Sequence, residues 1–373
     1  MQRLWLSHDA DDHSQAFVSV PGHAGTMTNA IEARMEPGPV TMSVDDVRDL
    51  ARALLVAHGL GADQAGAVAR VIAAGERDAC YSHGVYRIPG CVRAVRSGKL
   101  ATDAVPVIRD DPGPIVRVDA GFGFICLAFE RVRPVLAERA RRFGLAALVI
   151  NNCFHFSALW PEVEALAADG LVALAMTPSH SWVAPAGGTR PVFGTNPIAF
   201  AWPRPGQDPY VFDFATSETA RGEIELRRQN GQAIPAGWAI DAAGAPTTDP
   251  VSALAGAMMA FGGHKGSALS TMVELLAGAL VGDMLSFESK AFDDGAGVIP
   301  CHGELILAFS PERMTGGDPE AGVQRAEALF ARVVESGARL PGQRRYEARQ
   351  RALADGVSIS RTQYDILEAL RIP

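Results

Sequence analysis

Ala146-Ala-Leu-Val-Ile-Asn151 and Leu171-Val-Ala-Leu-Ala-Met-Thr177 are the stretches that set the fold class of this 373-residue chain. Both are short apolar runs, which is typical of buried strands, and the residues between them, about 160–169, follow a helical pattern. Strand-like segments also occur on either side of this pair, at 105–110, 114–120, 197–203 and 210–215. Helical patterns precede and follow this block of strands, and that order predicts an α+β fold.

Helix signals stand on both sides of the strands. Ser43 is a suitable N-cap, Asp45 favours the positive end of the helix that follows, and Gly59 ends it. Pro89 suits the first turn of a helix that stops at Gly98. Further helices are expected at about 63–77, 128–142, 265–281, 319–337 and 343–354, and after a capping box at Ser360.

The composition narrows the class of protein. The net charge is −8, and an acidic surface repels phosphate backbones, so nucleic acid is not an expected partner. No apolar run reaches the roughly 18 residues of a membrane span, and the acidic, His-rich start does not resemble a signal peptide. Five scattered cysteines predict no disulfide framework and fit a cytoplasmic protein. Residues 1–40 show no period and are expected to form a loose tail.

Nucleotide-binding signals are indirect. Gly121-Phe-Gly123 lacks the third glycine of a Rossmann fingerprint, and the chain has no P-loop. The best candidate for an anion site is Phe261-Gly-Gly-His-Lys-Gly266, at the start of the helix expected over 265–281. Free backbone N–H groups and the helix dipole favour a phosphate there, and His264 and Lys265 add donors. The alternative is a glycine-rich turn with an exposed lysine.

A second group of chemically suitable residues is Ser82-His-Gly-Val-Tyr-Arg87. A histidine is the natural proton shuttle near neutral pH, and an arginine can grip a carboxylate with two parallel hydrogen bonds. The alternative is a surface loop before a helix. Asp213, at the end of a strand, could place a carboxylate at a sheet edge or could cap the turn that follows.

A zinc site can also be drawn, from Cys80, His83, Cys153 and His155. Cys-x-His is poor spacing for structural zinc, and the surrounding residues are apolar. We therefore expect no metal, and we expect the two cysteines to be small buried hydrophobic residues.

Taken together and in order, several strings resemble the malate/L-lactate dehydrogenase family, whose fold is not the Rossmann fold. The resemblance runs from about Ser43 to the C-terminus. Its strings are Ser82-His-Gly-Val-Tyr-Arg-Ile-Pro89, Asn151-Asn-Cys-Phe-His-Phe-Ser-Ala-Leu159, Phe193-Gly-Thr-Asn-Pro-Ile-Ala-Phe200, Phe212-Asp-Phe-Ala-Thr-Ser217, Gly237-Trp-Ala-Ile-Asp241, Pro246-Thr-Thr-Asp-Pro250 and Phe261-Gly-Gly-His-Lys-Gly-Ser-Ala-Leu269. Within the family, the chain looks most like the Δ1-piperideine-2-carboxylate/Δ1-pyrroline-2-carboxylate reductases.

The resemblance implies roles for individual residues. Ser82 and His83 are two members of a proton relay, while Arg87 and Thr195 hold the substrate carboxylate. The residues that the resemblance places along the cofactor are His155, Phe156, Ser157, Ala158, Leu159, Asp213, Phe214, Ala215, His264, Arg339, Leu340, Pro341, Gly342, Gln343, Arg344 and Arg345.

One position departs from the pattern of the imine reductases. They carry Asp as the third relay member, whereas hydroxy-acid enzymes of the family usually carry Lys, and this chain has Glu223. Glu keeps the carboxylate but adds one methylene. Arg221 and Gly222, which we place at the substrate, stand just before it, and Arg221 fits the hydroxy-acid pattern.

The resemblance implies an NADPH-dependent reductase of a cyclic 2-imino acid, with NADH as a possible cofactor and a homodimer as its assembly. The alternatives are a 2-hydroxy-acid dehydrogenase acting on malate, lactate or ureidoglycolate, and a small-acid-binding protein without catalysis. The expected organisation is a tail at 1–40, a mainly helical substrate and dimerisation domain at 41–148 plus 290–373, and between these two parts a non-Rossmann NAD(P)-binding sheet domain at 149–289.

Overall fold

A computed structural model describes residues 38–109 and 111–372. Most of the tail expected at 1–40 lies outside these residues. The last tail position, Val40, instead begins a short strand, β1 (Val40–Met42), which pairs antiparallel with β13 (Val357–Ile359). The two ends of the described chain are therefore joined in one small sheet. No helix in the described ranges is both long and apolar enough to cross a membrane.

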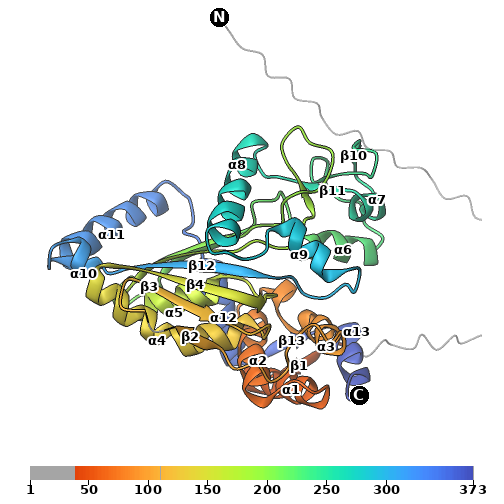
Figure 1. Cartoon of the computed structure of the whole chain (residues 1–373), viewed down its shortest axis with the longest axis horizontal. Coiled ribbons are helices and arrows are strands. Elements are labelled where there is room, and N and C mark those ends of the chain that lie inside the picture. The colour runs from red at the N-terminus through yellow and green to blue at the C-terminus, as the bar shows by residue number, and fades with distance from the viewer. Residues whose placement is uncertain (1–37, 110, 373) are drawn as a thin grey trace, which may run out of the picture. The chain divides into compact units, whose positions relative to one another are not determined.

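A seven-stranded mixed sheet forms the centre of the fold (Figure 1). Its order is β2 (Val107–Arg109), β3 (Ile115–Asp119), β4 (Leu145–Phe154), β12 (Cys301–Phe309), β5 (Val172–Met176), β7 (Ile198–Trp202) and β8 (Tyr210–Phe214). Only the β3–β4 pair is parallel. The six strands expected from apolar and alternating runs are confirmed, and so is the α+β class.

Strand β12 is the member of this sheet that sequence patterns did not reveal. It lies between β4 and β5, so that Ile306 is paired with Leu148 on one side and Ala175 on the other. Its sequence, Cys301-His-Gly-Glu-Leu-Ile-Leu-Ala-Phe309, mixes polar and apolar residues without a strand period. A strand with neighbours on both edges and both faces has no solvent side, so no alternation marks it.

Helices cover both faces of the large sheet. Leu148 and Ile150 of β4 share a core with α4 (Ile125–Phe143) and α5 (Trp160–Ala168). Val149, which points to the other face, packs instead with α8 (His264–Val273) and the π-helical turn Glu274–Ala279. This alternation follows from the two-residue repeat of a strand. Figure 1 shows α4 and α5 on one side of the sheet and α8 on the other.

Local signals place the remaining helices. Ser43 accepts a hydrogen bond from the Asp46 backbone in a full capping box and starts α1 (Val44–Ala57). The other helices before and after the sheet are α2 (Ala62–Arg77), α3 (Ile88–Arg96), α9 (Ser286–Asp293), α10 (Pro311–Met314), α11 (Pro319–Glu335), α12 (Gln343–Asp355) and α13 (Arg361–Ala369). Each expected helix is present, and most bounds fall within a few residues of the predicted ones. The exception is the helix expected over 265–281, because α8 ends at Val273 and continues as the π-helical turn Glu274–Ala279.

A smaller four-stranded sheet has its own core. Its order is β10 (Pro246–Thr247), β9 (Ala239–Ile240), β11 (Ala257–Met259) and β6 (Val183–Ala184). Ile224 of α6 (Arg221–Gln229) packs into this core with Met258 and Val183, and α7 (Pro250–Ala255) contributes Ala253. This unit therefore positions the first turn of α6, where Arg221, Gly222 and Glu223 lie.

Candidate functional site

Two short 3-10 turns, Tyr81–His83 and Val85–Arg87, bring together the side chains that sequence analysis placed at the reaction. Ser82 Oγ lies 3.0 Å from Nδ1 of His83. Arg87 Nε donates a 2.6 Å hydrogen bond to the backbone oxygen of Ser82. The loop thus holds a hydroxyl, an imidazole and a guanidinium in one rigid turn.

Buried Glu76 of α2 fixes this turn from behind. Its Oε1 accepts a 2.8 Å hydrogen bond from the backbone N–H of Val85. The carboxyl group fills the space where a Cβ on Gly84 would stand, only 2.0 Å away. Gly75 is equally constrained, because a Cβ there would meet the His83 backbone oxygen at 2.7 Å. Helix α2 therefore packs closely against the backbone of the turn that carries His83.

The electrostatic surroundings keep His83 neutral. Burial, with smaller contributions from the nearby Arg87 and His155, lowers the pKa of His83 to about 3. A neutral imidazole can donate at one ring nitrogen and accept at the other. This His83 is therefore suited to pass a proton on rather than to keep it.

The segments predicted to line a cofactor meet around β8. Asp213 Oδ2 accepts hydrogen bonds from the backbone N–H groups of Leu159, at 2.8 Å, and Trp160, at 2.9 Å. Burial raises the pKa of Asp213 to about 6, although these two bonds oppose the shift. The guanidinium of Arg345 lies over the Trp160 ring, 4.5 Å from its centroid. Residues 155–159, 213–215 and the 339–345 segment are thus neighbours in the fold.

Two further predicted positions are linked to the same strand. The backbone N–H of Thr216 donates to the Thr195 oxygen at 2.8 Å, and that of Phe261 donates to the Thr216 oxygen at 3.1 Å. Phe214 and Phe261 meet edge to face, with ring centroids 5.8 Å apart. The end of β8 therefore connects Thr195 with the loop in front of α8.

The start of α8 has the form of an anion site. Gly262 and Gly263 both adopt positive φ, at 57° and 61°, which L side chains rarely do. They present the exposed side chains of His264 and Lys265 at the first turn of the ten-residue helix. The helix dipole and these two donors suit a phosphate, although the N–H groups of Gly262, Gly263 and Lys265 already have partners within the chain. One acidic group is also there, since Glu218 accepts from the Gly262 N–H at 3.2 Å.

The third predicted relay member stands apart from the first two. Glu223 forms an ion pair with Arg227, one turn along α6, at 3.3 Å. In the described ranges, no hydrogen bond or ion pair joins Glu223 to Ser82 or His83. Its neighbour Arg221 packs its guanidinium 3.8 Å from the centroid of the Trp182 ring and donates to the Leu254 oxygen.

The cysteines do not form a metal cluster with His83 and His155 in the described part of the chain. Cys153 is buried and its thiol donates to the His302 backbone oxygen at 3.1 Å. Burial raises the pKa of the Cys80 thiol to about 11, so it remains protonated at neutral pH. The expectation of a small buried residue therefore holds for Cys153, whereas Cys80 is only partly buried.

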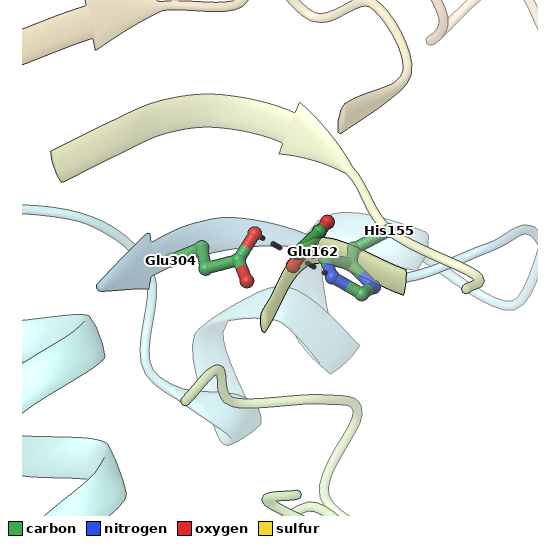
Figure 2. Close-up of side chains that lie close together, drawn as sticks. All are labelled: His155, Glu162 and Glu304. Atoms are coloured by element: carbon green, nitrogen blue, oxygen red, sulfur yellow. Dashed lines mark ion pairs between the residues drawn. The ribbon is translucent and has the colours of Figure 1, made fainter. Parts of the chain in front are cut away.

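A different buried cluster is present, which sequence reasoning missed. His155, Glu162 and Glu304 converge from three elements, and one polar atom of each lies within 4.8 Å of the others (Figure 2). Glu76 was missed as well. A charged residue among apolar ones, such as Glu304 in Gly303-Glu-Leu-Ile306, is the only signal that could have indicated such a group.

Comparison with known proteins agrees with this arrangement. The sequence profile described as malate/L-lactate dehydrogenase matches residues 42–368, which is most of the chain. The chain belongs to the malate/L-lactate dehydrogenase family. The sequence-based resemblance is thereby confirmed.

Individual relatives are more specific. The chain is 59% identical to Δ1-pyrroline-2-carboxylate reductase 2 of Burkholderia multivorans, over 89% of this chain and 97% of that protein. It is 54% identical to the Δ1-pyrroline-2-carboxylate/Δ1-piperideine-2-carboxylate reductase of Pseudomonas aeruginosa, over 89% and 99%. The crystal structure of Δ1-piperideine-2-carboxylate reductase from Pseudomonas syringae pvar. tomato superposes with a TM-score of 0.84 at 42% identity, covering 89% of this chain and 99% of that one.

The Glu76 anchor gives a prediction about stability. Burial raises the pKa of Glu76 from 4.5 to about 7, so the unfolded chain releases this proton first as the pH rises. Its contribution to the free energy of unfolding therefore decreases between about pH 4.5 and pH 7 and stays low above. The free energy of unfolding of Glu76→Gln minus that of wild type should be higher at pH 8 than at pH 5, by up to about 3 kcal/mol. Urea unfolding at both pH values measures this difference, with the exposed Glu347→Gln as control. An equal offset at the two pH values would contradict the expectation.

Proposed function

We propose that this protein is an NADPH-dependent reductase of Δ1-pyrroline-2-carboxylate and Δ1-piperideine-2-carboxylate, which it converts to L-proline and L-pipecolate. The observation that carries the proposal is its identity of 54–59%, over nearly the whole length of the relatives, with proteins named for this reaction. The reaction acts on a CH–NH bond, and it adds a hydride to C2 of the ring and a proton to the ring nitrogen.

Arg87 is the proposed carboxylate clamp. Its Nε is already committed to the Ser82 oxygen. Within the described ranges no acceptor is paired with its two terminal nitrogens, which point to a carboxylate as the missing partner. A guanidinium that grips a planar carboxylate with two hydrogen bonds fixes both the position and the orientation of the substrate. Such positioning supplies much of the rate in a reaction of this kind.

His83 is the proposed proton donor to the ring nitrogen, with Ser82 as its partner at 3.0 Å. With a pKa near 3, His83 is neutral at neutral pH, so it would take up a proton at one ring nitrogen as it passes the N–H proton of the other to the ring nitrogen of the imine. Glu223 is the proposed third member, which requires its carboxylate to leave Arg227 when the substrate binds. Proton transfer of this type contributes about 10²–10⁴-fold to the rate.

The dinucleotide supplies the hydride when bound. The residues proposed to hold it are the segments that meet around β8 together with the start of α8. His264 and Lys265 there fit the additional phosphate of NADPH, because both are exposed donors at the positive end of a helix dipole. We therefore propose NADPH over NADH.

We also propose a homodimer, with the site near the interface between subunits. In this organisation, residues 149–289 form the cofactor-binding sheet domain, inserted between the mainly helical parts at 41–148 and 290–373. Strand β12 belongs to the second helical part by sequence but lies within the large sheet. The two proposed domains therefore share a sheet.

The first test is an assay of the wild-type protein. We expect NADPH oxidation with Δ1-pyrroline-2-carboxylate and Δ1-piperideine-2-carboxylate, and at least about tenfold lower kcat/KM with pyruvate or oxaloacetate. NADH at the same low concentration should be slower than NADPH. Faster turnover of the oxo acids would instead favour the alternative, a hydroxy-acid dehydrogenase. Arg221 fits the sequence pattern of those enzymes.

Replacing the clamp tests the substrate site. Arg87→Lys keeps the charge but loses the bidentate grip, so the KM for the imine should rise about 10- to 100-fold. The dissociation constant of NADPH, measured by fluorescence titration, should change less than about threefold. An unchanged KM for the imine would remove Arg87 from the clamp. A melting temperature measured alongside shows whether the turn has remained folded.

The departure at Glu223 gives a test of the relay. A neighbouring carboxylate raises the pKa of a histidine. Glu223→Gln should therefore lower kcat and move the histidine-linked limb of the pH–rate profile to lower pH, while NADPH binding stays nearly the same. Glu225→Gln, two residues along the same helix and paired with Arg228, is the matched control. A wild-type rate and an unshifted profile would mean that Glu223 serves only its ion pair with Arg227.

A further inference from the structure

The buried cluster of His155, Glu162 and Glu304 includes the first residue of the proposed cofactor-lining segment 155–159. His155 is the first residue after β4, Glu162 is in the first turn of α5, and Glu304 is in β12 (Figure 2). The side chains of His155 and Glu304 are 3% and 0% exposed. Three ionisable groups therefore meet where water does not reach them.

The fold makes a specific adjustment that brings Glu304 here. The register between β12 and β4 shifts between His302 and Glu304, with Gly303 in the bulge. A Cβ on Gly303 would stand 2.8 Å from the Asp283 side chain and 3.0 Å from the Ala277 oxygen. Bulges of this kind redirect the side chains beside them. Glycine at 303 is thus required for the position of Glu304.

The charges of the cluster have few partners. In the described ranges no lysine or arginine pairs with Glu162 or Glu304, and Nε2 of His155 lies 3.6 Å from Oε2 of Glu304. That nitrogen, Oε2 of Glu162 and both Glu304 oxygens have no hydrogen-bond partner among the described residues. A fully ionised pair of carboxylates would therefore bury two negative charges against a single imidazole.

The neighbouring titratable groups further disfavour a negative charge on both carboxyl groups of the cluster at once. Asp213 of β8 and Glu304 both act on Glu162, and the Cys126 and Cys153 thiols lie close by. On the other side, His83 and the stacked His302, at 5.7 Å between ring centroids, face His155. Burial, followed by the charge of Glu304, raises the pKa of Glu162 well above its usual range. Two carboxylates that share a site cannot both ionise readily.

We propose that Glu304 is a positioning residue for the cofactor: its carboxyl group, brought beside His155 by the bulge in β12, holds the His155 ring against that strand. The proposal rests on the proposed function in one respect, namely that residues 155–159 line the dinucleotide. His155 begins that segment, and its backbone N–H is already fixed to the Pro300 oxygen at 2.9 Å. Asp213 fixes the other end of the segment. The segment is thus held through the backbone N–H groups of His155 and Leu159, and the cluster also holds it through the His155 side chain.

Two substitutions with opposite expectations test this. Glu304→Gln replaces the carboxyl group that faces His155 with an amide, so the dissociation constant of NADPH at pH 7 should rise about tenfold. Glu162→Gln resembles the protonated acid, so the constant should stay within about threefold of wild type. Exposed Glu320→Gln, on α11, is the matched control and should change nothing. Fluorescence titration measures these constants without any imine, so a protein that binds NADPH but reduces no imine would contradict the proposed function alone.

A cofactor-free measurement tests the proton on Glu162. Because the pKa of Glu162 is higher in the folded than in the unfolded chain, wild-type stability should fall as the pH rises from about 4.5 toward the folded pKa. Glu162→Gln should lose that part of the decrease, as urea unfolding at pH 5 and pH 9 would show. The pH dependence of the stability of Glu162→Gln can be measured even if Glu304→Gln fails to fold, so the protonation of Glu162 remains testable.

Several results would overturn the proposal. One is a Glu162→Gln variant that binds NADPH as weakly as Glu304→Gln does, since Glu162 would then be needed in its charged form. Another is a Glu162→Gln variant whose stability has the same pH dependence as wild type. A third is a metal ion bound at one per chain in purified wild type and lost in both variants, because the cluster would then be a cation site.

Discussion

The pairing of β12 with β4 and β5 is the constraint on which the rest of the fold depends. The strand comes from residues 301–309, yet it separates two strands that lie close together in sequence. Its two edges are satisfied by antiparallel hydrogen bonds, so the large sheet is continuous from β2 to β8. Without it, β4 and β5 would each present an unpaired edge in the centre of the core, where water cannot replace the missing bonds.

This arrangement also places the chemistry. His155 follows the end of β4, Asp213 lies at the end of β8, and β12 brings Glu304 beside His155. The turn with Ser82 and His83 comes from a different layer, where Glu76 holds it through the Val85 N–H. The site is thus assembled from parts of the chain that have no sequence proximity, and each part is fixed by its own buried carboxyl group.

These buried carboxyl groups are kept in place by different physical means. Asp213 accepts two backbone N–H groups, which offset part of the cost of burial. Glu76 has one such donor, and the pKa of its carboxyl group rises to about 7. Among the described residues, Glu162 has beside it only the Glu304 carboxyl group and an imidazole, and its pKa is raised well above the usual range. The fewer donors a buried acid has, the more strongly it favours its protonated form.

The sequence by itself determined the local elements: Ser43 caps α1, Pro89 opens α3, and the apolar runs become strands, because these signals act within a few residues. The family strings also identified the His83 turn and the segments around β8. Tertiary structure alone decided the place of β12, the β1–β13 pair, and the meeting of His155 with Glu162 and Glu304. It also placed Glu223 beside Arg227. Pairing across long stretches of chain depends on which surfaces bury each other, and no local period records that choice.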